Sequence, residues 1–400
     1  MTMTLGRLFA TMCIALTVLG SPARADSLAD VLRDAYHNSG LLDQNRALLR
    51  AADEDVAQSL AALRTVVTWQ AQAAYVATSA NQSSSSLSDD LSSSISVTAS
   101  LLLHDGGASA LATEVQKELV LQTREGLVQV EQEVLFRAVD AFMNVRRQSE
   151  FLALRRSNVG VIALDVVTPA AVQQNIEEAR AFAVRRHPNI IGAQHGVSAA
   201  ELNIRRAEAA LNPRLSLSGT IGLTDTGDST QSLGLTYGGT VYQGGQLQSV
   251  IRQEQARRDA SRSTLLITTQ GVKQNVGNAY AVLRVARASS EASGLQVRAA
   301  RTAFRGVREE ATLGARTTLD VLNAEQELLD AQASTISAQA DEVVASYRVM
   351  ASMGLLTADH LNLGVQVYDP AAYYNLVREA PATYSQQGQA LDRVLRSIGD

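Results

Sequence analysis

Histidine is the side chain in this sequence best suited to acid–base or metal chemistry, because its ordinary pKa of about 6.5 lies near neutrality. The five histidines are scattered along the chain, at His37, His104, His187, His195 and His360. No H-E-x-x-H, G-x-S-x-G or phosphate-loop pattern accompanies them. His187 and His195 are spaced to share a helical face, but surface positions are the simpler interpretation. The sequence therefore predicts no catalytic residues, no metal ligands, no cofactor and no enzymatic activity.

Two glycine pairs are the next candidates, because glycine-rich loops cradle phosphates. Gly106 and Gly107 occur in "LLLHDGGASALATEVQ", and Gly244 and Gly245 occur in "VYQGGQLQSVIRQE". Neither pair has the lysine and the spacing of a phosphate-binding loop. Each pair follows a strand-like run and precedes a long helical pattern. We therefore interpret both as strand-to-helix junctions, where glycine tolerates a change of twist and crowded backbones.

The elements that position these junctions follow a leader sequence. Arg7, the apolar run "LFATMCIALTVLG" and the A-x-A site before Asp26 predict a signal peptide over residues 1–25. The only cysteine, Cys13, lies inside it. Removal of the leader leaves 33 basic and 40 acidic residues, a net charge of −7, which excludes an electrostatic reason for nucleic-acid binding. Aromatic residues make up only 4% of the chain, which favours long helices packed side by side.

The remaining chain reads as two copies of one plan. A constant offset of 148 pairs Leu28 with Ile176, and farther along an offset of 138 pairs Gly106 with Gly244. We assign residues 26–174 to repeat 1 and residues 175–354 to repeat 2. Each repeat is predicted to contain short helices, a β-hairpin and a long helix.

The predicted hairpins cover residues of about 65–103 and 214–243. In "RLSLSGTIGL" the apolar residues alternate with serine and threonine, a pattern typical of strands in membrane barrels. Four strands cannot close a barrel, and an open strand edge is not tolerated in lipid. The hairpins must therefore be pooled between copies of the chain, and three copies would supply twelve strands.

The long helices are predicted at about 107–162 and 246–313. In the second helix, Val272, Val276, Ala279, Leu283 and Ala286 follow the 4-3-4-3 spacing of a coiled-coil seam. In the first helix we assign the seam to Val130, Val134, Ala138, Ala141 and Val145, whose spacing is 4-4-3-4. A return helix is predicted at about 317–353 in repeat 2 only.

Four stretches carry a resemblance to a known family: "NPRLSLSGTIG", "VYQGGQLQSVIRQEQA", "VGNAYAVL" and "GARTTLDVLNAEQELLDAQ". They resemble the TolC-like outer-membrane factors, the exit ducts of multidrug efflux and type I secretion. The resemblance implies a mainly α fold with a β-barrel part, in which a homotrimer joins a twelve-stranded outer-membrane barrel to a periplasmic α-helical coiled-coil barrel. It implies as partners the outer-membrane lipid, a periplasmic adaptor (membrane fusion) protein and an inner-membrane ABC or other transporter, but no nucleic acid.

The same resemblance assigns the tip turn of the tunnel to Gly314, Arg316 and Thr317. It makes Arg316 a gate-locking residue and places Asp320 in an acidic ring at the pore entrance. The second acidic position of that ring falls on Asn323, and a gate tyrosine falls on Ala311. A threefold axis would then gather three carboxylates instead of six, with weaker cation binding.

Repeat 1 departs from the family pattern. About 57 residues follow Val297 in repeat 2, whereas the equivalent Val159 is followed by Asn175 after about fifteen, so the return helix of repeat 1 is missing. Two functions from different classes therefore stay open: an outer-membrane efflux or secretion channel, and an assembly-impaired or non-conducting envelope protein. A coiled-coil adhesin is disfavoured because two hairpins interrupt the helices. The substrate and the role of residues 355–400, an expected periplasmic tail, are left open.

Overall fold

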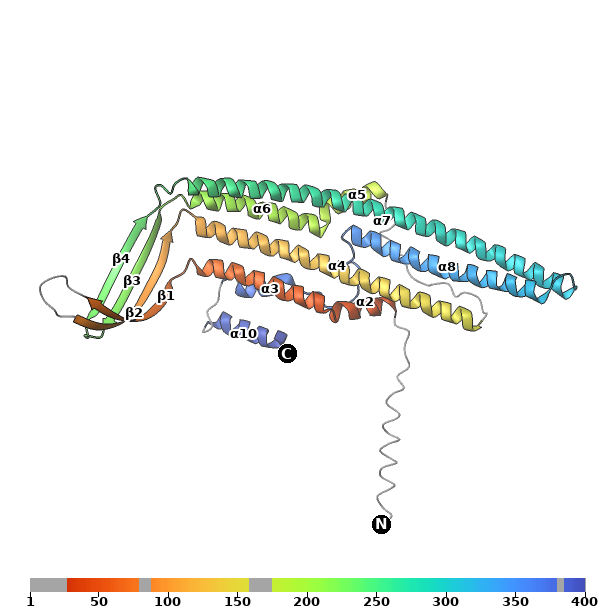
Figure 1. The fold of residues 1–400 in the computed structure, drawn as a ribbon, viewed down its shortest axis with the longest axis horizontal. Helices are drawn as coiled ribbons and strands as arrows, with labels where there is room; N and C mark the ends of the chain where they lie inside the picture. The colour runs from red at the N-terminus through yellow and green to blue at the C-terminus, as the bar shows by residue number, and fades with distance from the viewer. Residues whose placement is uncertain (1–26, 79–87, 158–174, 380–384, 400) are drawn as a thin grey trace, which may run out of the picture.

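The computed structural model describes residues 27–78, 88–157, 175–379 and 385–399. The helices run side by side along one long axis, with the sheet at one end and a helical hairpin at the other (Figure 1). The leader at 1–25 lies outside the described residues. No helix of the described part is long and apolar enough to span a membrane.

The short helices come in two pairs that start at local caps. α2 (Leu28–His37) and α3 (Gly40–Ala61) belong to the first half, and α5 (Ile176–Arg186) and α6 (Pro188–Ala209) belong to the second. Ser27 and Asp30 form a capping box at the start of α2, in which each side chain satisfies a free backbone N–H. The side chain of Asn175 caps α5 in a similar way by accepting from the N–H of Glu177.

Four antiparallel strands form one sheet in the order β1-β2-β3-β4. The strands are β1 (Val66–Thr78), β2 (Ser88–His104), β3 (Arg214–Thr224) and β4 (Ser229–Gly238). The pairing of β2 with β3 joins the two hairpins, with a register shift between Leu102 and His104. Within this chain β1 and β4 are therefore the edges of the sheet.

Both long helices start at the same end of the sheet, with α6 between them (Figure 1). α4 (Ala108–Ser157) and α7 (Gln246–Thr312) each begin after a glycine pair, and α8 (Thr318–Ser352) returns along α7. The predicted seam of α7 is buried throughout, from Val272 to Ala286. The predicted seam of α4 is only partly right: Val130, Val134 and Ala138 are half-buried against the core, but Ala141 and Val145 are exposed. The fully buried row of this helix is Leu135, Val139 and Met143. The error arose because α4 packs on α2, α3, α6 and α8 together, which no single heptad seam describes.

After α4 the described chain resumes at Asn175, directly before α5. The residues 158–162 that were expected to end the long helix lie outside the described residues. Residues 163–174 lie outside the described part as well, so the missing return helix of repeat 1 stays a prediction. α8 therefore has no counterpart among the described elements of the first half.

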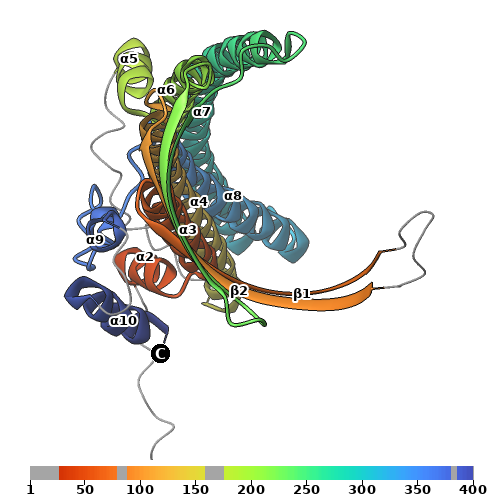
Figure 2. The same cartoon turned by 90° about the vertical axis from the view of Figure 1, so that its left-hand side faces the viewer.

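The C-terminal segment packs against the first half of the chain. It contains α9 (Pro370–Val377) and α10 (Gln386–Gly399). Tyr373 and Val377 bury a small apolar cluster with Ala57 of α3, and the Tyr373 hydroxyl donates to Glu54 at 2.6 Å. Figure 2 shows α9 and α10 on the outer side of α2 and α3.

Candidate functional site: a two-faced sheet and a helical tip

One face of the sheet is apolar across all four strands. The register aligns Trp69 with Val97 and Val97 with Ile221, and on β3 and β4 it aligns Leu217 with Leu235. These side chains are largely uncovered, with Trp69 72% and Leu235 65% exposed. An uncovered apolar face of this extent marks a surface that contacts lipid or another protein.

The opposite face of the sheet is polar. The same register aligns Thr68, Thr98, Thr220 and Ser232 in one row, in which the hydroxyls of Thr98 and Thr220 lie 3.0 Å apart. Figure 2 shows that the sheet is strongly curved. A curved sheet with one apolar and one polar face has the chemistry of a membrane barrel wall, whose lumen is polar.

The first strand-to-helix junction is held by Asp105. Its carboxylate accepts from the N–H of Gly107 at 3.0 Å and from the N–H of Ser109 at 2.8 Å, which caps the start of α4. Gly106 has a φ of +69°, and a Cβ there would lie 2.5 Å from Nδ2 of Asn212. Glycine is therefore required at this junction both for its backbone angle and for the close approach.

The second junction has the same backbone but a looser environment. Gly244 and Gly245 have φ values of +54° and +83°, and a Cβ at either would meet nothing within 4 Å. Gln243 stands where the first repeat has Asp105, and α7 starts at Gly245 without a side-chain cap. The second junction is therefore defined by its glycines alone.

The tip turn between α7 and α8 contains the residues that the sequence analysis assigned to a gate. Gly314 turns the chain with a φ of +77°, and Arg316 Nε lies 2.8 Å from Glu310 Oε2. Thr317 and Asp320 form a capping box, in which Asp320 accepts from the N–H of Thr317 at 2.9 Å and from its hydroxyl at 2.8 Å. These hydrogen bonds from Thr317, together with the charge of Arg316, lower the pKa of Asp320. Asn323 is exposed one turn later.

The histidines do not gather into a site. His187 is not a surface residue as expected: it is buried at the start of α6, where its Nδ1 accepts from the N–H of Asn189. Burial lowers the pKa of His187 to about 4, so the ring is neutral at physiological pH. His195 Nδ1 lies 2.7 Å from Glu118 Oε2. Within the described ranges, no group of histidine and carboxylate side chains is arranged to hold a metal ion.

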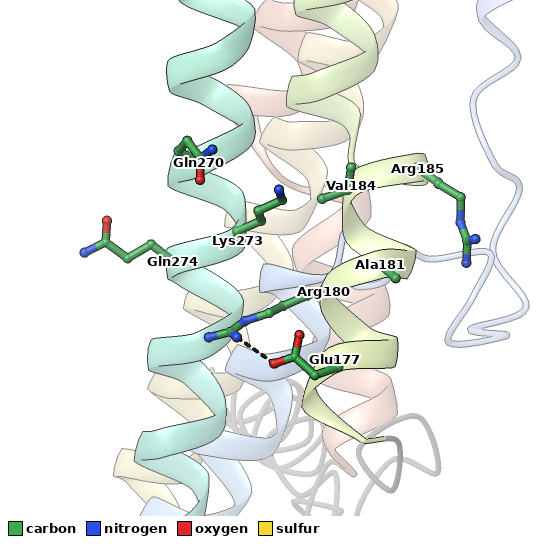
Figure 3. A pocket seen from close by; sticks show the side chains of 8 residues that line it. All are labelled: Glu177, Arg180, Ala181, Val184, Arg185, Gln270, Lys273 and Gln274. Carbon is green, nitrogen blue, oxygen red and sulfur yellow. Dashed lines mark hydrogen bonds and ion pairs between the residues drawn. The ribbon is translucent and has the colours of Figure 1, made fainter.

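An open pocket of about 750 Å³ lies between α5 and α7. Figure 3 shows Arg180 of α5 extending toward α7 and paired with Glu177, with Lys273 above it. Arg185 points away from α7 in this view. The pocket is lined by polar and charged side chains and contains no nucleophile paired with a base, so it offers no reactive centre.

Two equivalent ion pairs were missed in the sequence. Arg124 of α4 faces Asp53 of α3 at 3.9 Å, and Arg262 of α7 faces Glu201 of α6 at 2.7 Å. The offsets of 148 and 138 map Asp53 onto Glu201 and Arg124 onto Arg262. Applying both offsets to charged residues would have found this pairing, which the two halves share.

Comparisons with known proteins agree with this geometry. The family described as "Outer membrane efflux protein" matches residues 181–355. The outer membrane efflux protein BepC of Brucella suis is 29% identical over an alignment that covers 91% of this chain and 93% of the relative. The alkaline protease secretion protein AprF of Pseudomonas aeruginosa is 27% identical over 46% of this chain and 40% of the relative.

Solved structures share the fold. The CmeC outer membrane channel of Campylobacter jejuni superposes with a TM-score of 0.65 at 14% identity, covering 88% of this chain and 89% of the channel. The MtrE outer membrane channel of Neisseria gonorrhoeae gives 0.64 at 16% identity, over 82% of this chain and 88% of the channel. The mainly helical fold with a small antiparallel sheet is thereby confirmed. On these likenesses, the chain is similar to outer membrane efflux proteins over most of its length and shares the fold of outer membrane channels.

Proposed function

We propose that three copies of this chain form a passive exit duct through the outer membrane. The observation that carries the proposal is the two-faced sheet, whose apolar rows run across four strands and whose edges β1 and β4 are open. In lipid each unpaired backbone group costs several kcal/mol, so the edges must pair. Pairing β1 of one copy with β4 of the next gives twelve strands around a threefold axis.

The helices would continue this barrel as a tunnel in the periplasm. Both long helices leave the same end of the sheet and run in the same direction, which a continuous duct requires (Figure 1). A periplasmic adaptor and an inner-membrane ABC or other transporter would then supply the substrate at the tip. The names of BepC and AprF concern efflux and protein secretion, and we propose one of these two roles for this chain.

The tip residues have a proposed role in this duct. Asp320 lies in the first turn of α8, and three copies would bring three such carboxylates around the axis. One oxygen of each carboxylate is already engaged by Thr317, which leaves the other free to face a cation. We propose that this ring is a weak cation site and that the pair of Arg316 with Glu310 stiffens the tip turn.

A second candidate function is an assembly-impaired relative that does not conduct. The observation that favours it is the short connection of residues 158–174 between α4 and α5, where repeat 2 has α8. The alignment with BepC spans 430 positions, whereas 91% of this chain is about 364 residues, so about 66 positions of that alignment have no residue from this chain. A shortened first repeat is consistent with this difference.

Membrane fractionation combined with crosslinking separates the two candidates. The duct predicts that the protein is found in the outer-membrane fraction and yields crosslinked trimers there. The impaired relative predicts monomers or recovery in the soluble periplasm. The matched control is Leu235→Asp on the apolar face of β4, which should prevent membrane recovery if that face meets lipid.

A further inference from the structure

The two helices of the tip hairpin carry opposite charge. α7 has eleven basic and five acidic residues, a net charge of +6, and α8 has one basic and six acidic residues, a net charge of −5. The equivalent helix of the first repeat, α4, has seven of each and is neutral. The polarisation therefore belongs to the second repeat and not to the general plan.

The end of this hairpin extends beyond α4. Arg147 of α4 pairs with Asp341 of α8, so Ser157, ten residues farther along α4, lies at the height of residue 331 of α8. Burial agrees, because the buried residues of α8 begin at Ala331 and those of α7 end at Ser293. About 20 Å of the α7–α8 hairpin thus projects past the end of α4 (Figure 1).

The charges of the projecting part lie in two rows, defined here as the arginine row and the acidic row. The arginine row is Arg298, Arg301, Arg305 and Arg308, which are exposed. The acidic row is Glu327 and Asp330, which are also exposed. Among the described residues no ion pair joins the two rows within the chain, because they face away from each other.

The faces follow from the half-buried residues between α7 and α8. In α7, the residue directly before each arginine of the row faces α8; for example, Ala300 precedes Arg301. In α8, the residue directly after each member of the acidic row faces α7; for example, Leu328 follows Glu327. One position is about 100° around a helix. The step to an arginine goes forward along α7, and the step to an acidic residue goes backward along the antiparallel α8, so both rotate in the same sense about the long axis. The two starting residues point toward each other, so the same rotation carries the two rows to opposite faces of the hairpin.

The rows also match in height. Arg287 Nε lies 3.7 Å from Glu342 Oε1, so residues of α7 and α8 at one height have numbers that sum to about 629. Arg301 and Glu327 sum to 628, and so do Arg298 and Asp330. A threefold axis along the tunnel leaves every residue at its own height, so Arg298 and Arg301 of one copy meet Asp330 and Glu327 of the next copy at their own levels. Arg305 and Arg308 lie closer to the tip, beyond the two acidic residues.

We propose that the projecting hairpins of neighbouring copies pack directly on each other, with the arginine row of one copy against the acidic row of the next. This contact rests on the proposed trimer and specifies its tip as a ring of six helices, two from each copy. A surface on one face that complements the opposite face is what a closed head-to-tail ring needs. The contact fills the place that a return hairpin of the first repeat would otherwise occupy.

Disulfide crosslinking tests the contact. In a Cys13→Ser background, the double variant Arg301→Cys with Glu327→Cys is oxidised in outer-membrane fractions and separated without reductant. Within one chain these positions lie on opposite faces of adjacent helices, beyond the 7 Å limit between Cα atoms for a disulfide. Bonds can therefore form only between copies. The expected result is a ladder of covalent dimers and trimers that reductant removes, and each single-cysteine variant is the control without a ladder.

The native mass in detergent separates failure of this contact from failure of the duct. A trimeric mass without a ladder overturns the contact and leaves the proposed function standing. A crosslink to a protein of another mass also overturns it, because the arginine row then serves a different acidic partner. A monomeric mass contradicts the proposed function, and the contact falls with it. Arg298→Cys with Asp330→Cys repeats the test one turn higher, with the same expected ladder.

Discussion

The two halves of the molecule use the same ion pair in opposite surroundings. In the first half Asp53 is fully buried beside Arg124, and the ring of Tyr374 from the C-terminal segment lies 5.2 Å from the guanidinium of Arg124. In the second half the side chains of Glu201 and Arg262 are 43% and 54% exposed, and they lie 2.7 Å apart. The two halves therefore differ in what covers their helices. The C-terminal segment packs on the first half, whereas the second half contains the hairpin of α7 and α8.

The long helices α4 and α7 also differ in which of their faces are buried. α4 buries Leu135, Val139 and Met143 against several short elements, and Val145 on another face is 68% exposed. α7 buries one continuous seam and continues past the end of α4. α4 is thus covered by α2, α3, α6 and α8, and its face around Ala141 and Val145 stays exposed in the single chain.

The largest expected effect is on the core of α4. Leu135→Ala should lower the free energy of unfolding by about 2–5 kcal/mol, because Leu135 is fully buried and a cavity would remain. Val145→Ala should change it by less than about 0.5 kcal/mol, because the side chain is already in solvent. Thermal unfolding of both variants in detergent checks the comparison. Equal losses would mean that the assembled protein buries Val145.

The junctions should differ next. Ala at position 106 or 244 is strained by about 1–2 kcal/mol at positive φ. Gly106→Ala should lose roughly 1–3 kcal/mol more, since its Cβ would overlap Asn212, whereas Gly244→Ala meets open space. Unfolding midpoints of the two variants test this order, and a larger loss for Gly244→Ala would contradict it.

The buried ion pair of Asp53 and Arg124 should make the free energy of unfolding depend on pH. Burial raises the pKa of Asp53 to about 6, against the opposing charge of Arg124. The folded state therefore favours the protonated acid, and its stability falls as pH rises from about 4 to about 6, by roughly 2–3 kcal/mol from this group. Asp53→Asn should remove this part of the pH dependence. An unaltered profile in Asp53→Asn would show that the pair is not desolvated.

The smallest expected effect is at the tip. Asp320→Asn weakens the capping box of α8, so the first turn of that helix should fray more readily. If the proposed ring faces the pore, the same variant should weaken block by multivalent cations, and Asn323→Asp should strengthen it. Conductance in planar bilayers measures the block, and a block unaffected by both changes would place the ring outside the pore.

Much of the fold could be predicted because its signals are local. Alternation defines strands such as β3, and glycine pairs and the spacing from Val272 to Ala286 define the junctions and the seam of α7. The packing of α4 and the burial of His187 could not be predicted, because both depend on segments distant in sequence. His187 is covered near Gly354, and the ion pair of Asp53 is covered by the C-terminal segment. The spacing of the arginine row is visible in the sequence. That the row lies on a part of the hairpin beyond the end of α4 follows only from the packing of α4 on α8.

Single-channel recording from the purified protein tests the central claim most directly. Protein extracted from outer membranes and added to a planar lipid bilayer should insert in discrete steps of uniform conductance, because three two-faced sheets close around one polar lumen. Leu235→Asp should abolish insertion, since it places a charge on the apolar face. Absence of conductance from a protein that is recovered as a trimer would contradict the duct and leave the non-conducting relative as the function of this chain.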